Sequence, residues 1–172
     1  GFITDVTAQR EANDALRQSE ARTRIVVEQM PAILWTVDAN LRYESSLGAG
    51  LKALGIEPNQ HNGMTLWEYF QTTDPEYKPI AMHLRAVGGE AVSYETEWAG
   101  NIYQSFLEPR RNEEGIVTGV IGVALDVTEH RRADQNLRQV EAHFRAAFDN
   151  APIGMALIGT QGTYVQLNKR FC

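Results

Sequence analysis

The feature that most restricts the possible folds of this chain is an internal repeat. The stretch DVTAQREA at residues 5–12 returns as DVTEHRRA at residues 126–133, an offset of 121 residues. Without a gap, eleven of the twenty positions in 5–24 are identical to those 121 residues later. This period is longer than a solenoid repeat and suits one small domain with its connector. We therefore expect a window on a tandem array, with one complete domain and parts of two neighbours.

The composition is that of an ordinary globular protein, with 43% hydrophobic and 22% charged residues. The net charge of −6 argues against a nucleic-acid-binding surface, which needs clustered Lys and Arg. The single cysteine, Cys172, excludes an intrachain disulfide and a multi-cysteine zinc site, and it fits a reducing cytosol. Because no apolar run approaches ~20 residues, we expect no membrane contact and a cytoplasmic location, although the parent protein could be anchored elsewhere.

Hydrophobic periodicity predicts five strands, with a helical region between the second and the third. The third strand alternates Val92, Tyr94, Thr96 and Trp98 with polar residues, which indicates one buried face. The last strand is apolar on both faces, as a central strand would be. The predicted strands cover residues 32–38, 41–46, 91–98, 101–108 and 116–127.

The helices predicted within residues 50–88 should cover one face of this sheet. In the last of them, Ile80, Leu84 and Val87 share one helical face. Three consecutive strands after these helices favour an α+β fold with an antiparallel sheet over a doubly wound parallel one. Long linker helices are expected on either side, at 8–30 and 129–149.

Several stretches resemble the PAS superfamily of sensory domains. GVIGVALDVTEHRRA (119–133) and GFITDVTAQREA (1–12) are similar to the last PAS strand with its Asp-Ile/Val-Thr motif, followed by the signalling helix. GGEAVSYETEW (88–98) is similar to the turn into the third strand, and residues 148–172 to the opening of a further PAS domain. The resemblance covers essentially the whole chain and implies a PAS fold.

This resemblance divides the chain into five parts. Residues 31–128 form the complete PAS domain, and a linker helix lies on either side of it. The expected parts are the end of an upstream PAS domain (1–7), a linker helix (8–30), the complete domain (31–128), a second linker helix (129–149) and the opening of a following PAS domain (150–172).

The repeated Asp-Val-Thr motif has two interpretations. A negative charge just before a helix N-terminus is favoured by the helix dipole, and an Arg five residues later could turn back to pair with it. On this basis the motif is only a strand-to-helix cap. The resemblance implies that it is also the transmission point between sensor and output. The residues concerned are Asp5, Thr7, Arg10, Asp126, Thr128 and Arg131.

Cofactors bound by PAS families can be tested against the residues. Flavin–cysteinyl and coumaric-acid photoreceptors need a cysteine in the helical region, and residues 47–90 contain none. Haem-binding members carry their ligand about three helical turns before the Gly-Glu at residues 89–90, whereas His83 lies closer. We therefore predict no cofactor and consider haem improbable, with His83 packed at the edge of the core and His61 solvated.

Aromatic residues between helices and sheet could line a ligand pocket, because pockets of this kind are mostly apolar with a few polar groups. The alternative is that they simply fill the core. The candidate pocket residues are Trp35, Trp67, Tyr69, Phe70, Tyr94, Trp98, Phe106 and His83. They do not identify a ligand.

Nothing indicates an enzyme within this chain. Neither His130 nor His143 is followed by the acid, aliphatic, Arg and Pro of a histidine-kinase phosphoacceptor, and no phosphate-cradling Gly loop or nucleophile elbow occurs. The parent protein is expected to be a bacterial sensor histidine kinase or diguanylate cyclase, as the resemblance implies.

The connectors have a constant length, with 26 positions from the motif Asp to the following Pro in both copies. In the second, apolar residues at alternating spacings of four and three form an a/d seam of Ala133, Leu137, Val140, Phe144 and Ala147. The first carries Ala12, Leu16, Ser19, Thr23 and Val26 in the same register.

We therefore expect a parallel homodimer in which the linker helices relay a signal between adjacent PAS domains and an output domain of the same protein. The first alternative is a sensor that binds haem or another small ligand. The second is a structural spacer between other domains.

Overall fold

The chain is described by a computed structural model covering residues 10, 13, 17–18, 21–23 and 25–171. Predictions that concern Asp5, Thr7 and Cys172, and most of the first helical seam, lie outside the described residues. The fold divides between Val127 and Thr128 into two compact units, each described by itself.

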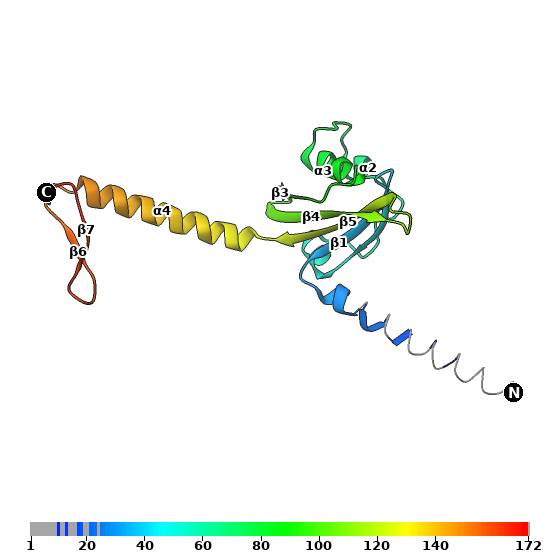
Figure 1. The fold of residues 1–172 in the computed structure, drawn as a ribbon, viewed down its shortest axis with the longest axis horizontal. Coiled ribbons are helices and arrows are strands. Elements are labelled where there is room, and N and C mark those ends of the chain that lie inside the picture. The colour runs from blue at the N-terminus through cyan, green and yellow to red at the C-terminus, as the bar shows by residue number, and fades with distance from the viewer. Residues whose placement is uncertain (1–9, 11–12, 14–16, 19–20, 24, 172) are drawn as a thin grey trace. The chain divides into compact units, whose positions relative to one another are not determined.

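The first unit contains a five-stranded antiparallel sheet with the order β2-β1-β5-β4-β3 (Figure 1). This confirms the predicted α+β fold and antiparallel sheet. The strands are β1 (Ile33–Asp38), β2 (Tyr43–Leu47), β3 (Val92–Trp98), β4 (Asn101–Arg111) and β5 (Val117–Asp126).

Strand β5 lies at the centre of the sheet, between β1 and β4. Its alternate residues Val120, Gly122 and Ala124 are buried on the side of the helices. Ile121 and Leu125 point to the other face and are exposed. Strand β5 is therefore apolar on both faces, as the sequence indicates, but within this unit only the face toward the helices is buried.

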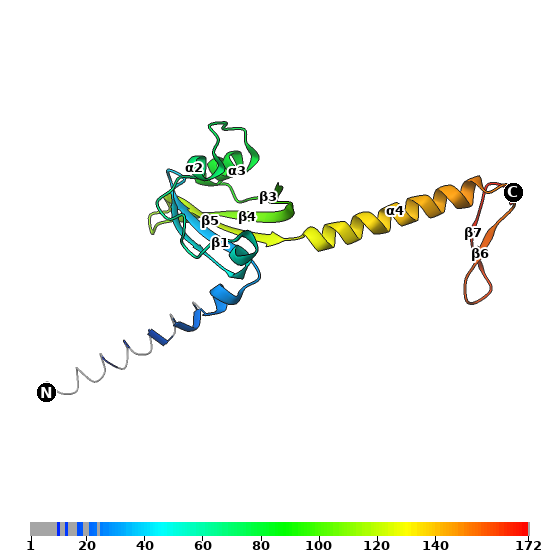
Figure 2. The same cartoon turned by 180° about the vertical axis from the view of Figure 1, so that it is seen from behind.

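Three short helices separate β2 from β3: the 3-10 helix η1 (Ala49–Leu54), α2 (Leu66–Phe70) and α3 (Lys78–Val87). Helix α2 begins with a capping box, in which Thr65 accepts from the Glu68 amide and the Glu68 carboxylate accepts from the Thr65 amide. Helices α2 and α3 lie on one face of the sheet, as the view from behind also shows (Figure 2). Helix α3 packs against β3, β4 and β5.

The buried face of α3 agrees with the predicted one at Ile80 and Val87 but not at Leu84. Leu84, which the sequence pattern places inward, is 43% exposed. Pro79, Ile80, His83 and Ala86 are the residues that face the core. The helix is turned toward His83 because that side chain makes a buried hydrogen bond to the sheet, a possibility that apolar periodicity alone does not reveal.

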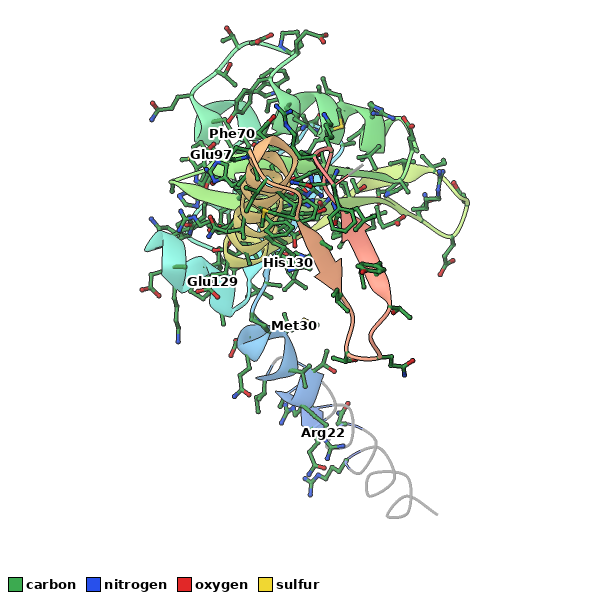
Figure 3. The ribbon with its side chains drawn as sticks, turned by 90° about the vertical axis from the view of Figure 1, so that its left-hand side faces the viewer. Arg22, Met30, Phe70, Glu97, Glu129 and His130 are labelled. Carbon is green, nitrogen blue, oxygen red and sulfur yellow. The ribbon has the colours of Figure 1, made fainter. Side chains whose placement is uncertain are left out.

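Before the sheet, residues 21–23 and 25–29 are helical (Figure 3, where Arg22 and Met30 are labelled). The Met30 amide still bonds to the Val26 carbonyl at 3.1 Å, and the helix ends before Pro31. Pro31 disfavours helical geometry in the residue that precedes it.

The second unit consists of α4 (Thr128–Asn150) and a hairpin of β6 (Ala156–Ile158) and β7 (Tyr164–Leu167). Buried Asn168 joins the two, because its side-chain amide donates to the carbonyls of Phe148 and Ile153, each at 2.9 Å. Its Oδ1 accepts from the Met155 amide at 2.8 Å. Among the described residues, no helix has the length and apolar character needed to cross a membrane.

Gly122 provides a first test of this packing. The Trp35 indole lies directly on its backbone, and a Cβ built at Gly122 would come within 2.2 Å of the ring. We expect Gly122→Ala to displace Trp35 and to lower the free energy of unfolding by about 1–3 kcal/mol, the usual effect of overpacking a core. Ile121→Ala, on the exposed side of the same strand, should change it by about 0.5 kcal/mol or less. Equal urea midpoints for the two variants would contradict this packing.

Candidate functional site

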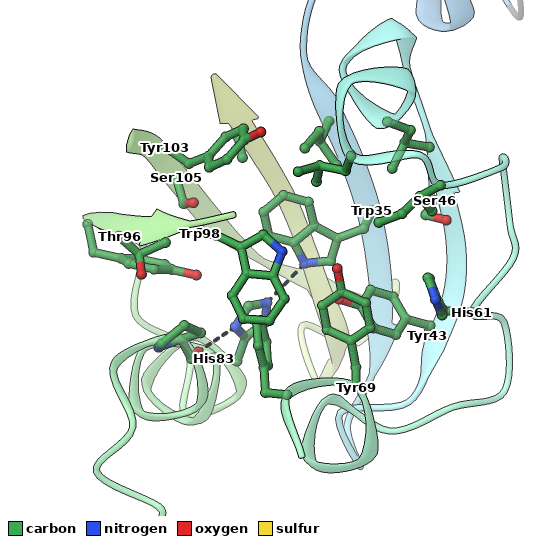
Figure 4. A pocket seen from close by; sticks show the side chains of 18 of the residues that line it. Trp35, Tyr43, Ser46, His61, Tyr69, His83, Thr96, Trp98, Tyr103 and Ser105 are labelled. Atoms are coloured by element: carbon green, nitrogen blue, oxygen red, sulfur yellow. Dashed lines mark hydrogen bonds between the residues drawn. The ribbon is translucent and has the colours of Figure 1, made fainter. Parts of the chain in front are cut away.

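The first unit contains a cavity of about 90 Å³ between its helices and its sheet (Figure 4). The alternation of β3 and β4 supplies one wall, with Tyr94, Thr96, Trp98, Tyr103 and Ser105. The opposite wall comes from β1 and β2, with Trp35, Tyr43 and Ser46. The helical region adds His61, Tyr69, Phe70, Tyr77, Pro79 and His83. Small side chains such as Ser105 and Ala124 leave the space open between the large rings.

A buried chain of hydrogen bonds joins this sheet to α3. The indole Nε1–H of Trp35 donates to Nε2 of His83 at 2.9 Å, and His83 Nδ1 lies 2.7 Å from the Pro79 carbonyl oxygen. An indole can only donate and a carbonyl oxygen can only accept, so the two partners together assign the proton to Nδ1. Trp35 and His83 thus hold each other in one orientation across the cavity (Figure 4).

This environment keeps His83 neutral. The side chain is 1% exposed, and burial lowers its pKa to about 4, against a smaller opposing effect of the Pro79 carbonyl. The neutral form is also the one that the hydrogen bonds require, because a protonated Nε2 could not accept from Trp35.

Tyr103 differs from the other polar groups of the cavity. The residue is 4% exposed, and within the described part of the chain its hydroxyl has no hydrogen-bond partner. By contrast, the Tyr94 hydroxyl bonds to Ser105. Tyr103 therefore lines the cavity, but its hydroxyl is fully buried and lacks a partner among the described residues.

The remaining rings form a continuous aromatic cluster. Tyr69 contacts Tyr43, His61 and Trp98 with ring centroids 5.6, 4.9 and 6.0 Å apart, and Phe70 packs edge-on against Trp98 at 5.3 Å. Burial raises the pKa of the Tyr43 and Tyr69 hydroxyls, and it raises that of Tyr94 to about 12. These tyrosines are therefore neutral at physiological pH.

Of the candidate pocket residues, Trp35, Tyr69, Phe70, Tyr94, Trp98 and His83 line the cavity. Trp67 packs against the core but does not line the cavity. Phe106 lies on the opposite face of the sheet and is 46% exposed. Placing Phe106 in the pocket was wrong because consecutive β4 residues alternate faces, and the inward positions are Tyr103, Ser105 and Leu107.

Sequence reasoning missed Tyr103 and Ser105, although a signal for them exists. In the antiparallel pair β3–β4, Tyr94 lies opposite Ser105 and Thr96 opposite Tyr103. Residues directly opposite each other share a face of the sheet. Tyr94 and Thr96 were already assigned to the buried face. The register across the short turn at residues 99–100 therefore assigns Ser105 and Tyr103 to the same face.

The cavity does not fit haem or a flavin as it stands. The only lining imidazole on α3 already uses its Nε2 lone pair to accept from Trp35, so binding iron there would break a buried hydrogen bond. The volume of about 90 Å³ is also well below the ~300–1,000 Å³ of typical cofactor and drug sites. Over the described residues, no cluster of His, Cys, Asp and Glu has the geometry of a metal site.

The second Asp-Val-Thr motif lies where the central strand meets a helix. Strand β5 ends at Asp126, α4 begins at Thr128, and Thr128 is buried. The Val127 amide between them donates to the Ile102 carbonyl at 2.9 Å, which ties the end of β5 to β4. Of the first copy, only Arg10 lies among the described residues, and it is helical and exposed.

The chain matches known protein families. A family profile described as PAS fold matches residues 27–132, and one described as PAS domain matches residues 142–172. The solved structure of an RNA-binding light-oxygen-voltage receptor superposes with a TM-score of 0.55 at 21% identity, covering 78% of this chain and 39% of that chain.

Two relatives are similar in sequence. Over 168 residues the chain is 29% identical to the uncharacterized protein y4lL of Sinorhizobium fredii (strain NBRC 101917 / NGR234), covering 87% of this chain and 19% of that protein. Over 42 residues it is 43% identical to the probable diguanylate cyclase DgcE of Escherichia coli (strain K12), covering 24% of this chain and 4% of that protein. The chain thus spans about a fifth or less of the length of these relatives.

The buried His83 predicts a particular pH dependence of stability. Unfolding returns the pKa of His83 from about 4 to about 6.5. Between these two pH values the imidazole is protonated in the unfolded chain and neutral in the folded chain. The resulting contribution to stability is complete above pH 6.5 and is lost as the pH falls toward 4. Between pH 7 and pH 5 it should amount to about 2 kcal/mol.

Urea unfolding of the wild type and of His83→Gln at both pH values measures this contribution. The carboxylates titrate in both proteins, so the difference between their pH dependences isolates His83. We expect the variant to lose less stability than the wild type on acidification. Parallel pH profiles would contradict the buried neutral imidazole.

Proposed function

The chain belongs to the PAS fold family, and from this premise we propose that residues 31–128 form a sensory module. It relays a signal through the helices on either side to an output domain elsewhere in the same protein. The observation that carries the relay is the position of β5, which borders the cavity and continues through one residue, Val127, into the 23 residues of α4.

A change at the cavity has a short physical path to α4. Gly122 of β5 supports Trp35, and Ala124 of β5 lines the cavity itself. Strand β5 is held by β1 on one side and β4 on the other, so a shift of Trp35 is transmitted along the strand toward its C-terminal end at Asp126. Packed cores transmit strain because they are nearly incompressible.

Helix α4 has a face suited to pairing. Its apolar residues at a/d spacing are exposed, with Leu137 at 68% and Val140 at 65%, and Phe144 is exposed as well. Burying such a seam against a second copy removes apolar surface from water, which favours a parallel coiled-coil homodimer. A rigid helix fixes rotation as well as distance, since each residue turns its axis by ~100°.

The similarity to a probable diguanylate cyclase supports an output of that class, and a histidine kinase is the second candidate for the output. The chain covers only a small share of its relatives, so the proposed output domain is assigned to the parent protein outside these residues. The PAS domain profile over 142–172 supports the proposal that residues 150–172 open a following PAS domain.

The first prediction of this proposal concerns dimer formation by α4. Leu137→Lys with Val140→Lys places two charges in the seam, and we expect the 172-residue chain to sediment as a monomer. The matched control, Gln135→Lys with Gln139→Lys, adds the same charge off the seam and should remain dimeric. A seam variant with the dimer mass, or a monomeric wild type, would rule out pairing through this face.

The second prediction concerns the relay itself. In the full-length parent, an insertion of seven residues after Gln139 restores the heptad register and should preserve regulation of the output. An insertion of four residues rotates the seam and should lock or abolish it. Output activity is measured with and without the stimulus in each variant. If both insertions leave regulation intact, the helix is a tether between domains and the relay is wrong.

A further inference from the structure

We propose that the turn at residues 48–50 couples the upstream linker helix to the PAS domain. The described part of this helix directly before the sheet covers residues 21–23 and 25–29. The inference rests on the proposed relay and names the contact through which a signal from that helix enters the domain. It follows from the hydrogen bonds at the end of the helix, the close packing of Gly50, and the position of η1.

The end of the upstream helix is capped by this turn. The last carbonyls of a helix have no partner within the helix, so they bond to another segment or to water. The Met30 carbonyl, directly after the last helical residue, accepts from the Ala49 amide at 2.9 Å. The Ala32 carbonyl accepts from the Gly50 amide at 3.1 Å. Two consecutive amides of the turn therefore hold the connection between the helix and β1.

The turn also lies against this connection without an intervening side chain. Gly48 has a φ of 107°, and a Cβ there would lie 2.2 Å from the Ala32 carbonyl oxygen. A Cβ at Gly50 would lie 2.9 Å from the Ala32 carbonyl carbon and oxygen and from the Ile33 side chain. Because backbone atoms cannot move aside without shifting the chain, a side chain at either position would push the turn away from residues 32–33.

The same turn leads into a wall of the cavity. Helix η1 begins at Ala49, and Leu51 and Leu54 of this helix line the cavity, as does Ile56 after it. Leu51 is buried, so η1 is packed into the core and not only resting on it. Packed cores transmit displacements because they are nearly incompressible. A rotation of the upstream helix therefore shifts η1 through the bond between Met30 and Ala49.

The first test compares alanine substitutions near the two ends of η1 in the 172-residue chain. Gly50→Ala adds a methyl group against residues 32–33. Gly55→Ala, the matched control, adds the same group at a φ of 67° with nothing within 4 Å, so it strains the far end of η1 and leaves the connection untouched. Backbone amide hydrogen exchange, followed by NMR at pH 7, reports the local opening of each segment.

We expect Gly50→Ala to raise the exchange rates of the Ala49 and Met30 amides roughly threefold to tenfold over the wild type. This is the factor that the loss of one hydrogen bond produces. The Met30 amide bonds to the Val26 carbonyl, so its exchange reports the end of the upstream helix. Gly55→Ala should leave the Met30 amide unchanged. A wild-type rate for Met30 in Gly50→Ala, or an equal increase in the control, would overturn the coupling.

The second test perturbs the helix and observes η1, because coupling between two sites is reciprocal. Glu28 is helical and exposed. Glu28→Pro disrupts the last turn of the helix, whereas Glu28→Ala removes the same charge and keeps the helix. We expect the Ala49 and Leu51 amides to exchange roughly threefold to tenfold faster in the proline variant than in the alanine variant, with β4 unchanged.

Equal rates at Ala49 and Leu51 in the two Glu28 variants would contradict the coupling, and so would an equal acceleration in β4, which indicates general loss of stability. This second test does not depend on whether Gly50→Ala folds. Both tests measure coupling within this chain and need no output domain. The insertions after Gln139 test the relay through α4, so the failure of one proposal is distinguishable from the failure of the other.

Discussion

The hydrogen bond between Trp35 and His83 connects the middle of the sheet to the helix that covers it, and much of the first unit is arranged around it. It exists only because Gly122 lets the indole lie flat on the central strand and because α3 turns His83 inward, at the expense of exposing Leu84. The hydrogen bond to the Pro79 carbonyl fixes the imidazole of His83 in one tautomer, and burial keeps it neutral. The pair connects the sheet to helix α3, and the cavity lies beside this connection.

The cavity is lined mostly by aromatic rings. Among the described lining residues there is no Lys, Arg, Asp or Glu, and the Trp35 indole and the His83 imidazole satisfy each other across the cavity. The same walls reject haem, since the imidazole that could approach iron already accepts from Trp35.

Strand β5 is the element on which the proposed relay depends. It takes part in the floor of the cavity, pairs along its length with two strands, and passes into α4 after one residue. The exposed residues of α4 have the spacing of a helix-pairing seam, whereas Phe148 near its end is buried with the hairpin of the second unit. A helix with an exposed apolar stripe along its length is suited to pair with a second copy, as the proposed relay requires.

Much of the architecture was determined by the sequence alone. The repeat identified a domain of PAS length, and the period-two pattern, together with Gly and polar turns, located all five strands within about two residues at most ends. These are local signals, because alternation and turn chemistry act over a few residues. The tertiary structure decided what local signals do not contain: which face of α3 is buried, that His83 is a core residue bonded to Trp35, that Phe106 points away, and that Tyr103 points in. Each of these side-chain orientations depends on contacts between residues up to 48 positions apart in the sequence. Hydrogen-bond partners and strand register, and not hydrophobicity, decide which way each side chain points.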